Sequence, residues 1–522
     1  MMKYLFLDIC LINNTYYIIL LKILHESQYV MKEKIPLLLL VSVSCSHKPA
    51  EIPRSADEFP NIILLMADDL GYGDLGCYGN QTVKTPNLDM MARDGVRFNR
   101  FYSAAPVSSP TRGSCLTGRH PSRYGVMWAG REPIPADEIT LAEALKSRGY
   151  ATGHFGKWHL GGLSRTVIQG EFPGGPSPYS PPWENGFDEC FSTESMVPNY
   201  NPYYHVGGSY GSADYRQIQT EPVAKGQRTG GTVWLDRYWT GPGQVVDEWL
   251  EGDDSEIIMD RALSFIRKSS AVKAPFLAVI WFHTPHTPVV AGNEYRSLYP
   301  ELPTDQQHWF GAISALDEQV GRLRTYLRDN GLANNTIIWF CSDNGPSYIH
   351  NYNSAGPLRG KKSELYEGGI RVPAIMEWPA KFPDPMTVET PVSTSDFYPT
   401  LLAVTNTVIE NQPELDGENI LPLLEGKSET RRPIGFFSPL PSPKRKQETM
   451  VEEQYALIDR QYKIISMDNG ISFQLYDLIL DQGESTDIAH EQPEVLADMK
   501  NKLLPWITKC KEDGKPYYSG YN

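Results

Sequence analysis

Apolar runs that alternate with amphipathic stretches are the feature of this 522-residue chain that most constrains its fold. Four runs have the length and composition of buried strands: 61–67, 276–282, 337–341 and 372–378. Between them, residues 258–266 and 309–327 carry apolar side chains at helical spacing, and Asn330-Gly331 marks the end of the second helix. Strands that alternate with helices predict an α/β fold, with a large, mostly parallel sheet flanked by helices.

The C-terminal part of the chain has a different pattern. Residues 439–446 are rich in proline and basic side chains and are typical of a linker. Three short apolar runs follow, each bounded by turn residues: 455–458, 462–465 and 473–476. A helical pattern then covers about residues 493–510. We therefore expect residues 57–430 to form the main domain, and residues 447–522 to form a smaller α+β subdomain of antiparallel strands and one helix.

The charge of the chain limits its partners. The net charge is −15, which argues against general affinity for nucleic acid. Five cysteines follow residue 45, with spacings that fit neither a zinc site nor a disulfide framework: Cys77, Cys115, Cys190, Cys341 and Cys510. We expect Cys115 to be a packing residue of a helix and Cys341 to be a buried thiol in a strand.

The N-terminus carries an export pattern that does not begin at the first residue. Residues 1–30 are apolar but irregular, and we interpret them as an upstream extension ahead of a natural start at Met31. Residues 31–45 contain a short basic segment, an apolar run and small residues, which together predict a signal peptide. Cys45 fits a bacterial lipoprotein cleavage site, and ordinary cleavage near Ser44 is the alternative. We expect an exported protein, in the periplasm or anchored to the outer membrane through a lipid on Cys45.

Residues 108–112 (Ser-Ser-Pro-Thr-Arg), followed by Cys-Leu-Thr-Gly-Arg at 115–119, form a compact motif. Taken alone, the motif predicts a loop and a helix that starts near Pro110, with Ser109 or Thr111 as its cap. Ser108 would then lie just before a helix N-terminus, where backbone N–H groups and the helix dipole favour anions.

Two pairs of oxygen-bearing side chains follow predicted strands. Asp68-Asp69 come directly after the first strand, and Asp343-Asn344 follow the strand at 337–341. Ligands of α/β sheets gather at the carboxyl ends of strands, and adjacent carboxylates repel each other unless a cation lies between them. Asp-Asn-Gly alone is also a common turn. If the two strands are neighbours, the four side chains predict a site for a hard cation, Ca²⁺ more readily than zinc.

Three further blocks carry basic residues: 156–161 (Gly-Lys-Trp-His-Leu-Gly), 284–288 (Thr-Pro-His-Thr-Pro) and 358–373, which contains Lys361, Lys362 and Glu367-Gly368-Gly369. With the motif at 108–112 and the acidic pairs, these blocks closely resemble the type I, formylglycine-dependent sulfatases of the alkaline-phosphatase-like superfamily. The resemblance covers about residues 58–380 and is to the bacterial, exported, Ser-type members.

The resemblance implies a chemistry as well as a fold. Ser108 would be oxidised to formylglycine, an aldehyde that serves as the nucleophile, by an anaerobic, radical-type maturase. The implied catalytic residues are Ser108, Arg112, Lys157, His159, His286 and Lys362. The implied ligands of one Ca²⁺ ion are Asp68, Asp69, Ser108, Asp343 and Asn344. The implied activity is that of a sulfuric ester hydrolase acting on O-sulfated glycans.

The resemblance also assigns roles within the blocks. Arg112 would steady the hydrated aldehyde, His286 would touch the sulfate and the leaving oxygen, and His159 would serve as a base. Counting back from Glu367-Gly368-Gly369 places Lys362 on the catalytic lysine of the family, with Lys361 as the alternative. His283 is interpreted as a supporting or packing histidine.

Two other functions stay open from the sequence. A phosphate or phosphonate ester hydrolase on the same fold would leave Ser108 unmodified, and a silent relative would only bind carbohydrate. The Gly-, Pro- and Tyr-rich segment 163–250 would wall part of the substrate site. Five residues are candidates for a sugar subsite: Trp158, Trp183, Trp239, His205 and Arg216.

Overall fold

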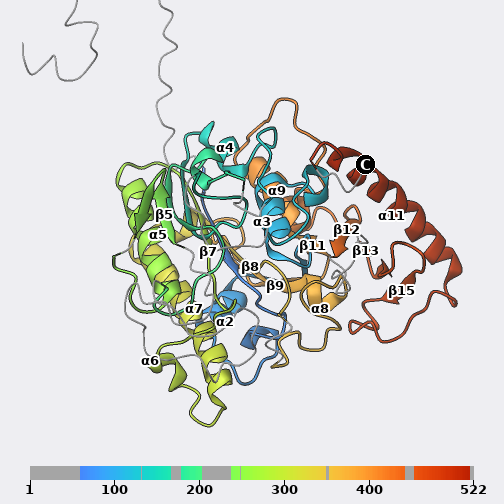
Figure 1. The fold of residues 1–522 in the computed structure, drawn as a ribbon, viewed down its shortest axis with the longest axis horizontal. Coiled ribbons are helices and arrows are strands. Elements are labelled where there is room, and N and C mark those ends of the chain that lie inside the picture. Colours follow the sequence, from blue (N-terminus) through green and yellow to red (C-terminus); the bar gives the residue numbers. More distant parts are fainter. Residues whose placement is uncertain are drawn as a thin grey trace, which may run out of the picture. The chain divides into compact units, whose positions relative to one another are not determined.

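The computed structural model describes residues 59–130, 132–165, 178–202, 237–246, 248–347, 352–440 and 452–517. All of them belong to one compact unit, Pro53–Asn522 (Figure 1). The expected start at Met31, the signal peptide and Cys45 lie outside the described residues. In the part of the chain that the structure describes, no helix has the length and apolar character that a membrane span requires.

A large mixed sheet forms the centre of this unit. Its strands in the described residues lie in the order β10-β2-β9-β8-β1-β7-β3-β4-β5-β6, and β11 pairs with β2. The strands are β1 (Asn61–Ala67), β2 (Val96–Tyr102), β3 (Ala151–Lys157), β4 (Glu189–Thr193), β5 (Tyr238–Gly241), β6 (Gln244–Val246), β7 (Phe276–Trp281), β8 (Thr336–Ser342), β9 (Arg371–Glu377), β10 (Met386–Val388) and β11 (Val392–Ser393).

The central strands are parallel and buried on both faces. β1 pairs in parallel with β7 on one side and with β8 on the other. All seven residues of β1 are buried, as are all residues of β7 and β8. Strands covered on both faces read as continuous apolar runs, which is why the sequence pattern identified them. β9, the fourth predicted run, is instead antiparallel to both of its neighbours.

Helices cover both faces of the sheet. One apolar core lies between the sheet and α3 (Ser108–Thr117), α4 (Leu141–Lys146) and α9 (Phe397–Val404). A second core lies between the opposite face and α2 (Pro86–Asp94), α5 (Asp254–Ala271) and α7 (Thr304–Asp329). The helices expected around 258–266 and 309–327 are present, and both are longer than their apolar pattern. Three short helices complete this region: α6 (Asn293–Arg296), α8 (Glu367–Ile370) and α10 (Leu421–Leu424).

The C-terminal region forms a four-stranded antiparallel sheet and a long helix, α11 (Pro493–Gly514). The sheet consists of β12 (Ile434–Leu440), β13 (Glu452–Asp459), β14 (Tyr462–Ser466) and β15 (Gln474–Asp477). β12 was not predicted, and it includes the first two residues of the stretch interpreted as a linker. Pro439 is tolerated there because β12 is an edge strand, where a missing N–H costs no ladder hydrogen bond.

Candidate active site

The carboxyl ends of β1 and β8 bring four polar side chains together. The two strands are parallel neighbours, so Asp68-Asp69 and Asp343-Asn344 follow at the same edge of the sheet. The backbone N–H of Asp69 donates to the Asp343 carboxylate at 3.1 Å, and the Asn344 amide donates to the Asp69 carboxylate at 2.7 Å. All four residues are buried.

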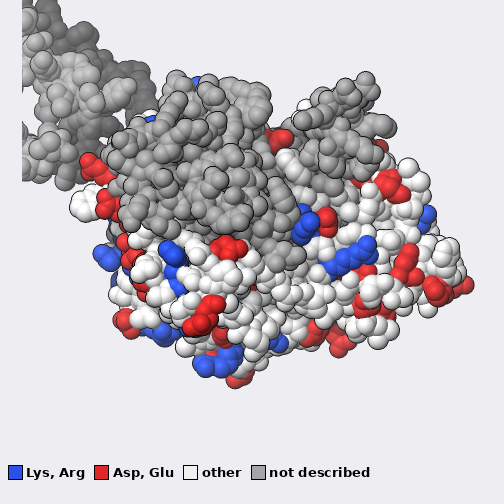
Figure 2. Space-filling model, turned by 60° about the horizontal axis from the view of Figure 1, so that its bottom comes forward, with Lys and Arg blue, Asp and Glu red and all other residues white. Residues whose placement is uncertain are grey.

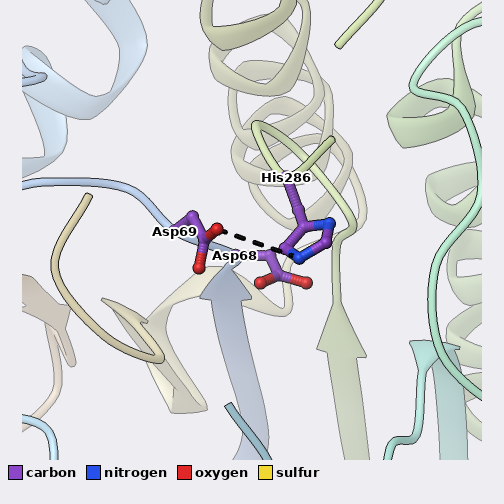
Figure 3. Close-up of side chains that lie close together, drawn as sticks. All are labelled: Asp68, Asp69 and His286. Carbon is purple, nitrogen blue, oxygen red and sulfur yellow. Dashed lines mark ion pairs between the residues drawn. The ribbon is translucent and has the colours of Figure 1, made fainter. Parts of the chain in front are cut away.

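His286 joins this acidic cluster from β7, the other parallel neighbour of β1. Asp68, Asp69 and His286 each offer one ligand atom, and these atoms lie within 4.8 Å of one another (Figure 3). Carboxylate and amide oxygens dominate the set, and such ligands suit a hard divalent cation. The residues therefore fit the metal that the resemblance implies, whereas the resemblance assigns His286 to the sulfate and not to the metal.

Ser108 faces the same acidic cluster from the N-terminal end of α3. It is the first residue of α3 and is fully buried. Its Oγ lies 3.4 Å from Asp68 Oδ1 and 3.3 Å from Asn344 Oδ1. The first turn of α3 has unpaired backbone N–H groups at its N-terminus, so the surroundings of Ser108 favour a negatively charged group.

The local structure of the Ser108 motif corrects one expectation. α3 begins two residues before Pro110, and its N-cap is Val107, which offers no side-chain cap. The predicted caps, Ser109 and Thr111, are therefore wrong. Thr111 instead donates its hydroxyl to the carbonyl of Ala105 at 3.0 Å, which holds the preceding loop against the helix.

Arg112 lies one helical turn into α3 and pairs with two carboxylates of the acidic cluster, Asp343 and Asp68. Its Nη2 is 2.8 Å from Asp343 Oδ2 and 3.4 Å from Asp68 Oδ2. Its Nη1 donates to the carbonyl of Lys157 at 3.0 Å, and its guanidinium lies over the ring of Trp281. The fully buried guanidinium thus links the helix of Ser108 to the ends of three strands.

Lys157 is the last residue of β3, and His159 lies in the turn that follows. Lys157 Nζ is 2.5 Å from Asp68 Oδ2. Gly156 has a φ of 100°, and a Cβ there would lie 2.0 Å from a backbone oxygen of β7, so this position requires glycine. His159 also has a left-handed backbone, with a φ of 56°, and its N–H donates to the carbonyl of Glu194 at 2.9 Å. Its side chain is nearly buried.

The two histidines after β7 have different surroundings. His286 Nε2 lies 3.8 Å from the Asp69 carboxylate, while its Nδ1 contacts the carbonyl of the next residue. His283 is fully buried, with Nδ1 2.8 Å from the Asp254 carboxylate and Nε2 2.7 Å from the Thr193 hydroxyl. Both ring nitrogens of His283 are occupied, which agrees with its interpretation as a supporting residue.

The structure places Lys362, rather than Lys361, beside the acidic cluster. Lys362 Nζ is 2.5 Å from Asp69 Oδ1, and its backbone N–H donates to the carbonyl of Pro346 at 2.9 Å. Lys361 is exposed. This arrangement agrees with the register counted from Glu367-Gly368-Gly369.

Opposite charges hold the site residues ionised despite their burial. Burial is the largest single influence on the pKa of Asp68 and would raise it, but the charges of Lys157, His286 and Arg112 together outweigh burial and the pKa lies well below its usual value. Burial would also raise the pKa of Asp69, but Lys362 and His286 together lower it. Burial would lower the pKa of Lys362, but the charges of Asp69, Asp68 and Asp343 together raise it.

The pKa values of the two histidines of the site, His159 and His286, are both lowered. Burial lowers the pKa of His159 well below its usual value, and the charge of Lys157 lowers it further. Burial, followed by the charge of Lys157, also lowers the pKa of His286. Both imidazoles are therefore neutral near pH 7 and able to accept a proton.

The structure corrects part of the expected sugar subsite. Trp158 and Trp239 are fully buried core residues, so neither ring is open to a sugar. Both rings belong to the apolar core between the sheet and α3, α4 and α9. Trp183 is half-buried, and its indole N–H donates to a tyrosine hydroxyl. His205 and Arg216 lie outside the described residues, as does much of the segment 163–250.

Sequence reasoning missed the residues that support the catalytic loops. Asp254 and Thr193 fix His283, and Gln454 and Lys463 of the C-terminal sheet contact the segment around Lys362. None of them lies in a motif, because each acts through a contact between segments far apart in the chain.

Comparisons with known proteins identify the family of this chain. The sequence profile of the sulfatase family matches residues 60–407, and the profile described as N-sulphoglucosamine sulphohydrolase, C-terminal, matches residues 361–509. N-acetylgalactosamine-6-sulfatase of Canis lupus familiaris is 33% identical over 404 residues, which cover 73% of this chain and 69% of that protein. Arylsulfatase A of Homo sapiens is 32% identical over 482 residues, which cover 85% of this chain and 87% of that protein.

A solved structure extends the similarity to the fold. The crystal structure of Ps i-CgsB in complex with k-i-k-neocarrahexaose has a TM-score of 0.70 and 27% identity, and the match covers 88% of this chain and 99% of that chain. The fold and the strand-end site define an ester hydrolase of the alkaline-phosphatase-like superfamily. Within that superfamily, this chain belongs to the sulfatase family and is a sulfuric ester hydrolase.

Proposed function

We propose that this protein removes sulfate from glycans, with Ser108 in its formylglycine form as the nucleophile and one Ca²⁺ ion in the acidic cluster. The observation that carries the proposal is the position of Ser108. Its Oγ faces the Asp68 and Asn344 oxygens at 3.4 and 3.3 Å, at the start of a helix and beside the cations of the site. A serine that only packs in the core would not require carboxylate oxygens, buried cations and a helix N-terminus around its hydroxyl.

The acidic cluster would hold the metal. Asp68, Asp69, Asp343 and Asn344 are the proposed ligands, joined by Ser108 after its oxidation. A bound Ca²⁺ ion would supply Lewis acidity and a fixed position for the ester oxygens. In its hydrated form, the formylglycine aldehyde would carry two hydroxyl groups. One would attack sulfur, and the second would serve in the release of sulfate.

The cations of the chain would act on the sulfate itself. Lys157 and Lys362 present ammonium groups on two sides of the acidic cluster. Charge grows on the ester oxygens as the bond to the alcohol breaks, and fixed cations stabilise that charge without reorganisation. Lys362 and His286 lie together at Asp69, from where a proton can reach the leaving oxygen. His159, neutral and nearly buried, is the proposed base for the release of sulfate.

Two relatives support a glycan substrate. One similar protein is named for N-acetylgalactosamine 6-sulfate chemistry, and one similar structure was solved with k-i-k-neocarrahexaose, a hexaose by name. An acidic protein that acts on an acidic sugar needs local positive charge, and the buried cations supply it. Where Figure 2 draws described residues, acidic and basic side chains are interspersed.

The same proposal includes a maturase and a location. A serine at the modified position requires an anaerobic, radical-type maturase, and the pattern at residues 31–45 supports export to the periplasm or to the outer membrane through Cys45.

Mass spectrometry tests the central claim. Trypsin should release the peptide Phe101–Arg112, and protein produced with its maturase should show the loss of two hydrogens from Ser108. The same preparation should desulfate members of a panel of sulfated mono- and disaccharides, while Ser108→Ala should not. Full activity with wholly unmodified serine, or turnover of phosphate or phosphonate esters instead of sulfate esters, would favour the rival hydrolase.

A further inference from the structure

The loop that carries Lys362 is held in place by the C-terminal sheet. Residues 359–367 make hydrogen bonds or ion pairs with side chains of β13, β14 and the segment after β15. Arg359 also donates to the Tyr476 hydroxyl at 3.2 Å and to the carbonyl of Glu484 at 3.0 Å. The loop therefore lies between the acidic cluster on one side and the small sheet on the other.

Ser363, directly after Lys362, has an unfavourable backbone conformation. Its φ is 76°, in the left-handed region that non-glycine residues rarely adopt. Such a conformation carries a steric cost and persists only when the surrounding contacts enforce it. The N–H of Ser363 donates to the carbonyl of Pro106, near the start of α3, at 2.8 Å. The conformation of this residue sets the direction in which Lys362 leaves the loop.

Gln454 provides the contacts on the other side of Ser363. Its Nε2 donates to the Ser363 carbonyl at 3.2 Å, and its Oε1 accepts from the Leu365 N–H at 2.9 Å. The side chain is 1% exposed, so neither backbone group can turn to water if the amide is lost. One buried amide from β13 therefore bridges the backbone on both sides of Glu364.

A buried ion cluster holds the end of the same loop. Lys463 of β14 lies 3.0 Å from one oxygen of Glu367 and 2.9 Å from Glu484. The second oxygen of Glu367 accepts from the Tyr102 hydroxyl at 2.9 Å, and the Glu367 N–H donates to Glu484 at 2.6 Å. Because all of these side chains are buried, the cluster is fixed and the loop cannot shift without leaving a buried charge unpaired.

From these contacts we infer that Gln454, on the C-terminal sheet, is a positioning residue for Lys362. It does not contact the acidic cluster; it acts by fixing the strained Ser363 and with it the ammonium group beside Asp69. The inference rests on the proposed role of Lys362 at the sulfate. Displacement of a reacting group by about 1 Å can cost about a hundredfold in rate.

The first test replaces the amide by an apolar side chain of similar size. Gln454→Met should lower kcat by about tenfold to a hundredfold. Gln461→Met, in the turn between β13 and β14, removes a hydrogen bond to Asp477 at 2.8 Å and should leave kcat within about twofold. In the Lys362→Ala background, Gln454→Met should have almost no further effect, since the residue through which it acts is gone. An equal loss in both backgrounds would overturn the inference.

A second test uses the strain at Ser363. Glycine adopts a φ of 76° without steric cost, so Ser363→Gly should restore part of the kcat that Gln454→Met removes. Because glycine also removes a steric cost from the folded state, the rescue is measured as kcat of fully folded protein, well below the Tm of each variant, where a merely destabilising effect would not alter the rate. Absence of any rescue in folded protein would contradict the positioning role.

Hydrogen exchange separates this inference from the proposed function. Peptides that cover residues 359–370 should exchange faster in Gln454→Met than in the wild type, and no faster in Gln461→Met. Unchanged exchange would overturn the inference even if sulfatase activity is confirmed. Faster exchange in a protein whose Lys362→Ala variant keeps full activity would instead contradict the proposed role of Lys362.

Discussion

Each carboxylate of the acidic cluster is matched by a cation of the chain itself. The three pairs are Asp68–Lys157, Asp69–Lys362 and Asp343–Arg112. All six side chains are buried or nearly so, which makes the balance of charge in the site close to neutral. Removal of one partner leaves the other buried and unpaired, at a cost of about 3–5 kcal/mol. Single substitutions in the site should therefore be judged together with a measurement of folding.

Neighbouring lysines should differ sharply in their effect on rate. Lys362 contacts Asp69 at 2.5 Å, whereas Lys361 is exposed. Lys362→Ala should lower kcat by about 10²–10³-fold, because a fixed cation at the developing charge is lost. Lys361→Ala should stay within about tenfold, or roughly 1.4 kcal/mol. Steady-state kinetics on a sulfated sugar substrate measures both, and the opposite ranking would mean that the register is off by one.

Metal binding should depend on Asp343. Asp343→Ala removes one of the proposed oxygen ligands and should abolish both calcium binding and activity. Isothermal titration calorimetry with calcium, after treatment with a chelator, measures the first effect. Asp384→Ala, at an exposed position, serves as the control and should bind one ion as the wild type does. Stoichiometric calcium in the Asp343 variant would contradict the ligand assignment.

At the scale of elements, the loop after β1 depends on a close backbone contact. Gly71 lies so close to residue 354 that a Cβ would be 2.1 Å from its carbonyl oxygen, and the Gly73 N–H donates to the same oxygen at 2.7 Å. Asp74 closes the turn by accepting from the Gly71 N–H at 2.8 Å. Burial raises the pKa of Asp74 to about 7. This carboxyl holds the loop directly downstream of Asp68-Asp69.

Stability should fall as the pH rises through the titration of Asp74. The folded protein keeps the proton up to about pH 7, whereas the unfolded chain releases it near pH 4, so the stabilisation present below pH 4 is lost between these values. Asp74→Asn removes this dependence, and its Tm relative to wild type should increase by a few degrees between pH 5 and pH 8, measured in excess calcium. Asp329→Asn, at an exposed position, should show no such trend; an equal trend in both variants would exclude Asp74 as the cause.

The elements that the sequence predicted well are those with a strong local signal. Both-face burial makes β1, β7 and β8 continuous apolar runs, and the amphipathic faces of α5 and α7 are equally clear. β12 has no such signal, because it is an edge strand that contains a proline and pairs only with β13. The cap of α3 was also missed, because tertiary contacts in the buried loop replace a side-chain cap.

The same distinction between residues with and without a local sequence signal applies to the candidate site. Asp68, Ser108 and Lys157 lie in short sequence blocks whose residue types predict a chemical role, and the structure brings these blocks together. Gln454 and Lys463 stand in ordinary strands, and their contacts with the catalytic loop depend on how two distant parts of the chain meet. Local sequence patterns carry no information on such contacts.

At the scale of the whole molecule, export should not require the first 30 residues. If the pattern at residues 31–45 is the proposed signal peptide, a chain that starts at Met31 should be exported as efficiently as the full chain. Cell fractionation followed by immunoblotting measures this. Cys45→Ala should move the protein from the membrane fraction to the soluble periplasm. Export that strictly needs residues 1–30 would contradict the assigned start.

The position of the C-terminal sheet in the chain has a consequence for the order of events during synthesis. The ribosome completes the proposed nucleophile, the proposed metal ligands and Lys362 before it reaches Gln454 and Lys463. A truncated chain that ends before β13 thus contains every residue proposed to touch the substrate, yet lacks the contacts that orient one of them. A premature stop codon late in the gene should therefore abolish activity although the proposed reactive residues are all present.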